Sequence, residues 1–168
     1  NNMEGLKKYF NQLLDESRAI TALDKLNPDS FKNPSLYGLI TAKYEYSKQN
    51  NVNINFEMYG QIEDADMQIY DLTRVIGIFL DNAMKYSNEK SEIRLELKTS
   101  GNKKIISVYN TGDGIPPEKQ KAIFERFYRL DSSRNRETGG FGLGLSIAKN
   151  IVDLHKGKIQ TVCLGYVL

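Results

Sequence analysis

The sequence predicts an α/β (α+β) sandwich in which a mixed, largely antiparallel sheet is covered on one face by helices. Two patterns predict it: alternating apolar and polar residues, typical of half-buried strands, and apolar residues three and four positions apart, typical of amphipathic helices. These stretches are interleaved, and two of the strands lie close enough in sequence to form an antiparallel hairpin. The 168 residues suffice for one domain with an N-terminal helix as an appendage.

The N-terminal segment has the pattern of that helix. Residues from Met3 to Ile20 alternate spacings of three and four, as in the seam of a short coiled coil or helical hairpin. One interpretation is an amphipathic helix that packs on its own domain. The other, which we adopt, makes residues 1–22 the remnant of a dimerisation helix and residues 23–168 a single domain.

The first elements of the domain follow from local signals. Asn33 can cap a helix that has Pro34 as its first residue and runs to about Gln49. Residues 52–58 alternate apolar and polar side chains and predict a strand. From Asp71 to Tyr86 the apolar residues fall on one helical face.

The later elements are predicted in the same way. Residues 93–97 form an alternating strand, and a turn at residues 100–102 returns the chain as a second strand over Ile105 to Tyr109. An amphipathic helix is expected from Ser146 to Leu154, and residues 159–168 are expected to begin a last strand.

Composition excludes several classes of function. The net charge is +2, and the 23 basic residues are scattered among 21 acidic ones, so no nucleic-acid partner is expected. The single cysteine, Cys163, rules out an internal disulfide and fits a reducing compartment. The longest apolar run, Val75 to Leu80, is too short to cross a bilayer, and no signal peptide is visible.

The most informative feature is the glycine-rich loop at residues 139–145, which leads into the last helix. Glycine lets backbone N–H groups approach a ligand closely, and the first turn of a helix carries unpaired donors. Such a junction is typical of a phosphate site, although alone it is a weak signal.

A second set of candidate residues lies on the helix expected over residues 71–86. Asn82 stands at the edge of the apolar stripe, with Lys85 and Tyr86 on the same flank. An amide oxygen suits a Mg²⁺ ion that takes its other ligands from water and phosphates. Lys85 could neutralise phosphate charge and Tyr86 could pack against a base. If this helix stood alone, a surface amide and an exposed lysine would be the better interpretation.

Two further segments lie between these features. Residues 110–116 are turn-rich and follow a strand, which by itself marks an ordinary loop. Residues 124–130 combine aromatic and basic side chains, and the simplest interpretation is an amphipathic helix with Phe124 and Phe127 in the core. A polar, lid-like segment follows at residues 131–138.

In this order the segments resemble the N, G1, F and G2 boxes of sensor histidine kinases. The resemblance is to their ATP-binding catalytic domain, a Bergerat-type (GHKL) fold shared with type II topoisomerases, Hsp90 chaperones and MutL mismatch-repair proteins. Four boxes in register are more specific than any one of them. Residues 26–81 also resemble the peptide-pheromone quorum-sensing receptor kinases. The boxes are Asp-Asn-Ala-Met-Lys-Tyr-Ser (81–87), Thr-Gly-Asp-Gly-Ile (111–115), Phe-Glu-Arg-Phe-Tyr-Arg (124–129) and Gly-Gly-Phe-Gly-Leu-Gly-Leu (139–145).

The resemblance implies a site for ATP and Mg²⁺. Asn82 would bind the metal, while Lys85 and Arg129, with Arg134, would hold phosphate charge. The backbone of the glycine loop would cradle the triphosphate under a lid, and Asn110 and Gly114 would seat the adenine. The implied nucleotide-binding residues are Asn82, Lys85, Tyr86, Asn110, Gly112, Gly114, Ile115, Arg129, Gly140, Phe141, Gly142, Leu143, Gly144 and Leu145.

Two departures from the family pattern carry expectations of their own. Kinases often have a second asparagine at position 78, and the ATPase relatives have a water-activating glutamate there; this chain has Ile78, which favours a kinase. The G1 box usually opens with aspartate, and here it opens with Asn110. Its amide can accept a bond from the adenine amino group without charge assistance, so we expect weaker ATP binding than with aspartate.

The resemblance also implies partners. His155, the only histidine, is expected to cap or pack the end of the last helix. The phosphoacceptor histidine would then lie on a helical hairpin outside the chain, through which the parent forms a homodimer. It would pass the phosphoryl group to the receiver domain of a response regulator. The parent would be membrane-anchored, with this domain in the cytoplasm. A Bergerat-type ATPase and a degenerate nucleotide-binding or scaffold module are the alternatives.

Overall fold

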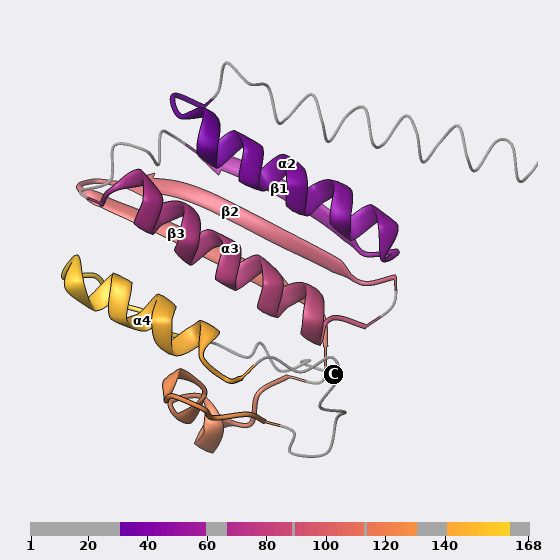
Figure 1. Cartoon of the computed structure of the whole chain (residues 1–168), viewed down its shortest axis with the longest axis vertical. Helices are drawn as coiled ribbons and strands as arrows, with labels where there is room; N and C mark the ends of the chain where they lie inside the picture. Colours follow the sequence, from indigo (N-terminus) through magenta and orange to yellow (C-terminus); the bar gives the residue numbers. More distant parts are fainter. Residues whose placement is uncertain (1–30, 60–66, 89, 113, 131–140, 162–168) are drawn as a thin grey trace, which may run out of the picture.

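The structure, a computed structural model, describes residues 31–59, 67–88, 90–112, 114–130 and 141–161. Helices cover one side of a three-stranded sheet (Figure 1), which confirms the predicted sandwich of helices on a sheet. The predicted N-terminal helix and the lid-like segment lie outside the described residues. The elements in chain order are α2 (Pro34–Gln49), β1 (Asn53–Tyr59), α3 (Ile69–Tyr86), β2 (Glu92–Ser100), β3 (Lys103–Asn110), the 3₁₀ turns η2 (Pro117–Lys119) and η3 (Ala122–Phe124), and α4 (Gly144–Leu154).

The sheet has the order β1-β2-β3 and is mixed, as predicted. Strands β2 and β3 form the antiparallel hairpin, which closes at Gly101 with a φ of +58°. Strand β1 pairs with β2 in parallel, with Ile54 opposite Ile93 and Phe56 opposite Leu95. The described strands therefore include one parallel and one antiparallel pair.

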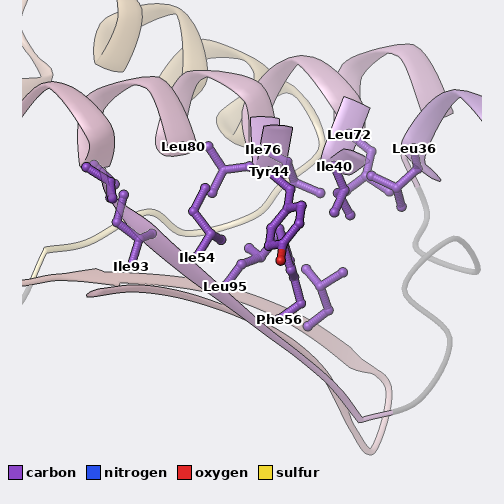
Figure 2. Close-up of a cluster of buried hydrophobic side chains, with 13 residues drawn as sticks. Leu36, Ile40, Tyr44, Ile54, Phe56, Leu72, Ile76, Leu80, Ile93 and Leu95 are labelled. Carbon is purple, nitrogen blue, oxygen red and sulfur yellow. The ribbon is translucent and has the colours of Figure 1, made fainter. Parts of the chain in front are cut away.

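The hydrophobic core lies between the helices and this sheet (Figure 2). Helix α3 is its centre, because it buries two faces. Leu72, Ile76 and Leu80 face the sheet and α2, whereas Val75 packs with Ala148 of α4 in a second cluster. The main cluster consists of Leu36, Ile40, Tyr44, Val52, Ile54, Phe56, Leu72, Ile76, Leu80, Ala83, Ile93, Leu95 and Leu97.

The predicted helix α2 is confirmed, the two later helices begin earlier than predicted, and the last predicted strand is not seen in the described residues. The Asn33 side chain accepts a hydrogen bond from the Ser35 N–H (2.8 Å) and caps α2 as predicted. Helix α3 begins at Ile69, before the predicted Asp71, and α4 begins at Gly144, before the predicted Ser146. Gly144 lies against Asn82 and Ile78 of α3, and this packing supports a helix start at a glycine despite its low helix propensity. Residues 159–161 form no strand, and residues 162–168 lie outside the described residues.

His155 has the packing role predicted for it. It is the C-cap residue of α4, and its Nε2 lies 2.9 Å from Oδ2 of Asp71 in the first turn of α3. The bond ties the end of one helix to the start of its neighbour.

Among the helices of the described residues, none is both long and apolar enough to cross a membrane.

Helix α4 ends in a Schellman motif. The Gly157 N–H donates to the Val152 carbonyl (2.8 Å), and the Lys156 N–H donates to the Asp153 carbonyl (2.9 Å). Lys156 occupies the left-handed position of this motif, with a φ of +56°. A residue with a Cβ loses about 1–2 kcal/mol in that conformation.

Replacing Lys156 with glycine is therefore expected to raise the free energy of unfolding by about 1 kcal/mol. Urea denaturation followed by circular dichroism measures the change. Lys121 is a matched control, because it is exposed and has a φ of −83°. Lys121→Gly is expected to lower the same quantity by about 0.5 kcal/mol. Equal or lower stability of Lys156→Gly than of the unchanged chain would contradict the expectation.

Candidate functional site

The last turns of α3 form the centre of the candidate site. Asn82 is half-buried there, and its Nδ2 donates to the Ile78 carbonyl at 2.8 Å. This bond uses the donor end of the amide and leaves Oδ1 as the acceptor for a ligand. A single protein oxygen of this kind fits a Mg²⁺ ion that keeps water and phosphate ligands. Among the described residues, no group of three or more His, Cys, Asp or Glu side chains can hold a metal.

The first residue of α4 lies against this amide. A Cβ built on Gly144 would be 3.5 Å from Asn82 Nδ2 and 3.5 Å from Ile78 Cγ2. Among the described residues, no side-chain hydrogen bond caps the N-terminus of α4 at Leu143, and the first N–H groups of a helix have no partner within it. The structure therefore places an uncapped, electropositive helix end beside the carboxamide of Asn82.

The G1 loop reaches the same end of α3 from the sheet. A Cβ built on Gly112 would be 2.5 Å from the Tyr86 carbonyl oxygen and 3.5 Å from Asn110 Nδ2. Only glycine permits this approach of the loop to the helix. The two glycine-containing loops thus lie against the C-terminal part of α3, one near Asn82 and one at Tyr86.

The F-box segment is tied to the glycine loop by the backbone. The Phe127 N–H donates to the Gly142 carbonyl at 2.9 Å. A Cβ built on Gly142, which has a φ of +69°, would be 2.7 Å from the Tyr128 carbonyl oxygen. Gly142 therefore fits this position because of both its conformation and its lack of a side chain.

The interpretation of residues 124–130 as an amphipathic helix is wrong. The helical part is the short turn η3, and Phe127 has a φ of +63° and is 70% exposed. The buried residue of η3 is Ile123, which precedes this segment, and η3 contacts α4. The left-handed backbone at Phe127 turns its ring to solvent.

The remaining predicted residues differ in exposure. Lys85 is exposed, and its Nζ lies 5.3 Å from the centroid of the Tyr86 ring, so it lies over that ring. Arg129 is half-buried in the coil after η3, and Phe141 is 85% exposed. Gly114 is exposed with a φ of +75°. Leu143, Leu145 and Ile115 are half-buried, whereas Gly139, Gly140 and Arg134 lie outside the described residues.

Two supporting residues escaped the sequence analysis. Gln120 Nε2 donates to the Ile115 carbonyl at 3.2 Å and fixes the end of the G1 loop. The buried Ser146 donates from Oγ to the Leu143 carbonyl at 2.9 Å, in the first turn of α4. A serine three residues after a helix start is a weak local signal, and no pattern points to Gln120.

The fold and these loops together define a class, the two-layer α+β domain in which glycine-containing loops lie against the end of a central helix. Residues 67–163 match the family described as "Histidine kinase-, DNA gyrase B-, and HSP90-like ATPase". Since the match covers more than half of the chain, the chain belongs to this family.

Its relatives narrow the class to the catalytic domain of histidine kinases. The signal transduction histidine-protein kinase ArlS of Staphylococcus aureus (strain USA300) is 44% identical over 97 residues, which are 58% of this chain and 22% of ArlS. The chain thus spans about a fifth of the curated relative's length. The resemblance of residues 26–81 to peptide-pheromone receptor kinases stays a prediction.

Solved structures agree with this fold. The catalytic domain of histidine kinase ThkA, in a nucleotide-free form, has a TM-score of 0.61 and 26% identity over 75% of this chain and 80% of that one. The histidine kinase domain of the E. coli osmosensor EnvZ has a TM-score of 0.52 and 29% identity over 79% of this chain and 77% of that one. The chain therefore contains a catalytic domain of the histidine kinase type.

Proposed function

We propose that this chain binds Mg²⁺-ATP at the C-terminal part of α3 and supplies the γ-phosphoryl group to a histidine outside the chain. The observation that carries the proposal is the close approach of Gly144 to Asn82. A Cβ built on Gly144 would be 3.5 Å from Asn82 Nδ2. It joins a magnesium-binding type of side chain to a phosphate-binding type of helix end. ArlS, a histidine-protein kinase by name, supports the assignment to phosphoryl transfer.

In this proposal the residues act mainly by position and charge, as phosphoryl transfer requires. Asn82 Oδ1 would bind the metal, which when present neutralises phosphate charge. The uncapped N–H groups at the start of α4 would hold phosphate oxygens. Lys85 and Arg129 would add positive charge at the rim. Ile78, where a glutamate would activate water, presents only an alkyl group to this site.

The base would lie near the G1 loop, at the end of α3 where Tyr86 lies. Asn110 would accept from the amino group of adenine, Gly114 would allow close approach of the base, and Tyr86 would lie against the ring. The backbone of Gly112 against the Tyr86 carbonyl supports a preformed turn at this place.

His155 is not the acceptor in this proposal. It is bonded to Asp71 at 2.9 Å, its side chain is 22% exposed, and it ends the helix whose other end faces the nucleotide. The acceptor would lie on an upstream helical hairpin, residues 1–22 being its remnant, and the parent would be a membrane-anchored homodimer with this domain in the cytoplasm. A ThkA structure contains the response regulator protein TrrA, which supports a response regulator as the phosphoryl recipient.

The test uses the 168-residue chain with γ-³²P-labelled ATP and Mg²⁺. We expect ATP binding by isothermal titration, no sustained phosphate release, and no label on the chain. Label that disappears in His155→Gln would identify His155 as the acceptor and overturn this part of the proposal. Steady hydrolysis would favour the ATPase alternative, and absence of nucleotide binding would favour a scaffold.

A further inference from the structure

Asn110 occupies the inner face of the sheet at the end of β3. Residues two apart on a strand share a face, so Asn110 lies on the same side as Ile106 and Val108. Those two side chains pack against the core under the helices. Asn110 is exposed, however, because the strand ends at this residue. It is therefore a polar group at the open edge between the two layers.

The surroundings of Asn110 belong to the proposed nucleotide site. Its Nδ2 lies 3.5 Å from the place of a Cβ on Gly112, and the same glycine contacts the Tyr86 carbonyl. The amide therefore lies close to the C-terminal end of α3. Among the described residues, no hydrogen bond fixes the Asn110 side chain in one orientation.

An amide in this place has a different hydrogen-bonding capacity from a carboxylate. An ionised aspartate only accepts, whereas asparagine carries an acceptor oxygen and a donor nitrogen on the same group. Rotation of the amide by about 180° exchanges the two ends. Adenine presents an amino donor at its 6-position with an acceptor at N1, and a 6-oxopurine presents an acceptor with an N1–H donor. Asparagine can complement both.

We propose that Asn110 makes the site tolerant of 6-oxopurine nucleotides, so that GTP binds as well as ATP. The inference rests on the proposed nucleotide-binding function and names the substrate class of the same site. With aspartate at position 110, the oxygen at the 6-position would meet a negative charge and a lone pair. With asparagine, Nδ2 donates to that oxygen and Oδ1 accepts from N1–H. Asn110 is accordingly the residue that sets base selectivity.

The experiment measures dissociation constants for ATP, GTP and inosine triphosphate with Mg²⁺ by isothermal titration of the 168-residue chain. Inosine triphosphate carries the 6-oxo group without the 2-amino group, so it isolates the edge that faces Asn110. The unchanged chain is expected to bind all three within about tenfold of one another. Asn110→Asp is expected to bind ATP more tightly and both oxopurine nucleotides more weakly. The ratio of the oxopurine dissociation constants to that of ATP should therefore rise by about tenfold or more.

Asn150→Asp is the matched control, because it adds the same charge at an exposed position of α4. It is expected to leave the ratio unchanged. If ATP binds while GTP and inosine triphosphate bind at least about 100-fold more weakly, the inference is overturned and the proposed function stands. A ratio that Asn110→Asp does not alter also overturns it. If no triphosphate binds, the proposed function and the inference both fail.

Discussion

Asn82→Ala is expected to lower the affinity for ATP in the presence of Mg²⁺ by roughly 100-fold, the largest effect on binding of any single side chain in the site. In the proposed site Asn82 Oδ1 would bind the metal, because Nδ2 is bonded to the Ile78 carbonyl. Without this oxygen, α3 would no longer bind the metal ion that would neutralise the charge on the phosphates. Isothermal titration with Mg²⁺ and with EDTA separates metal-dependent from metal-independent binding.

The loss would not reflect unfolding. Asn82 is half-buried, and alanine favours helix more than asparagine by about 0.6 kcal/mol. The bond to Ile78 lies within one helix turn, so α3 keeps its backbone without it. Asn150→Ala, on the exposed side of α4, is the control and should bind as the unchanged chain does. An Asn82→Ala chain that binds Mg²⁺-ATP with undiminished affinity would rule out Asn82 as the metal ligand.

The elements of this fold were predictable because their side-chain patterns are local. Alternation in residues 93–97 and the glycine at position 101 determine a hairpin strand and its turn, and the structure has both. The parallel pairing of β1 with β2 was not predictable, since alternation reports which face is buried and not which strand lies alongside. The distance between Ile54 and Ile93 in the sequence leaves that choice to tertiary packing.

The residues predicted to form the site stay a prediction, and the sequence did not show how the loops that carry them are held. The contacts of Gly112 with Tyr86 and of Gly142 with Tyr128 are between backbones, and no side-chain pattern records them. Hydrophobicity suggested a buried Phe127, but the positive φ of that residue directs its ring outward. Sequence patterns report burial only where the backbone is regular.

Gly142→Ala is expected to destabilise the domain by about 2–4 kcal/mol and to remove ATP binding. The φ of +69° is unfavourable for alanine, and the added Cβ would lie 2.7 Å from the Tyr128 carbonyl oxygen and 2.9 Å from the Phe127 carbonyl carbon. Both contacts are with backbone, so no side chain can rotate to make room. The F-box segment after η3 and the loop before α4 therefore have to move apart.

Separation would break the bond from the Phe127 N–H to the Gly142 carbonyl and free the start of α4 from the F-box segment. Since the N-terminus of α4 lies beside Asn82, the helix end that we propose to hold phosphate would shift with it. Urea denaturation measures the stability, and titration with Mg²⁺-ATP measures the binding. Gly38→Ala is the control: Gly38 lies in α2 with no atom within 4 Å of a built Cβ. The free energy of unfolding of Gly38→Ala should rise by about 1 kcal/mol. A Gly142→Ala chain as stable as Gly38→Ala would disprove the tight contact.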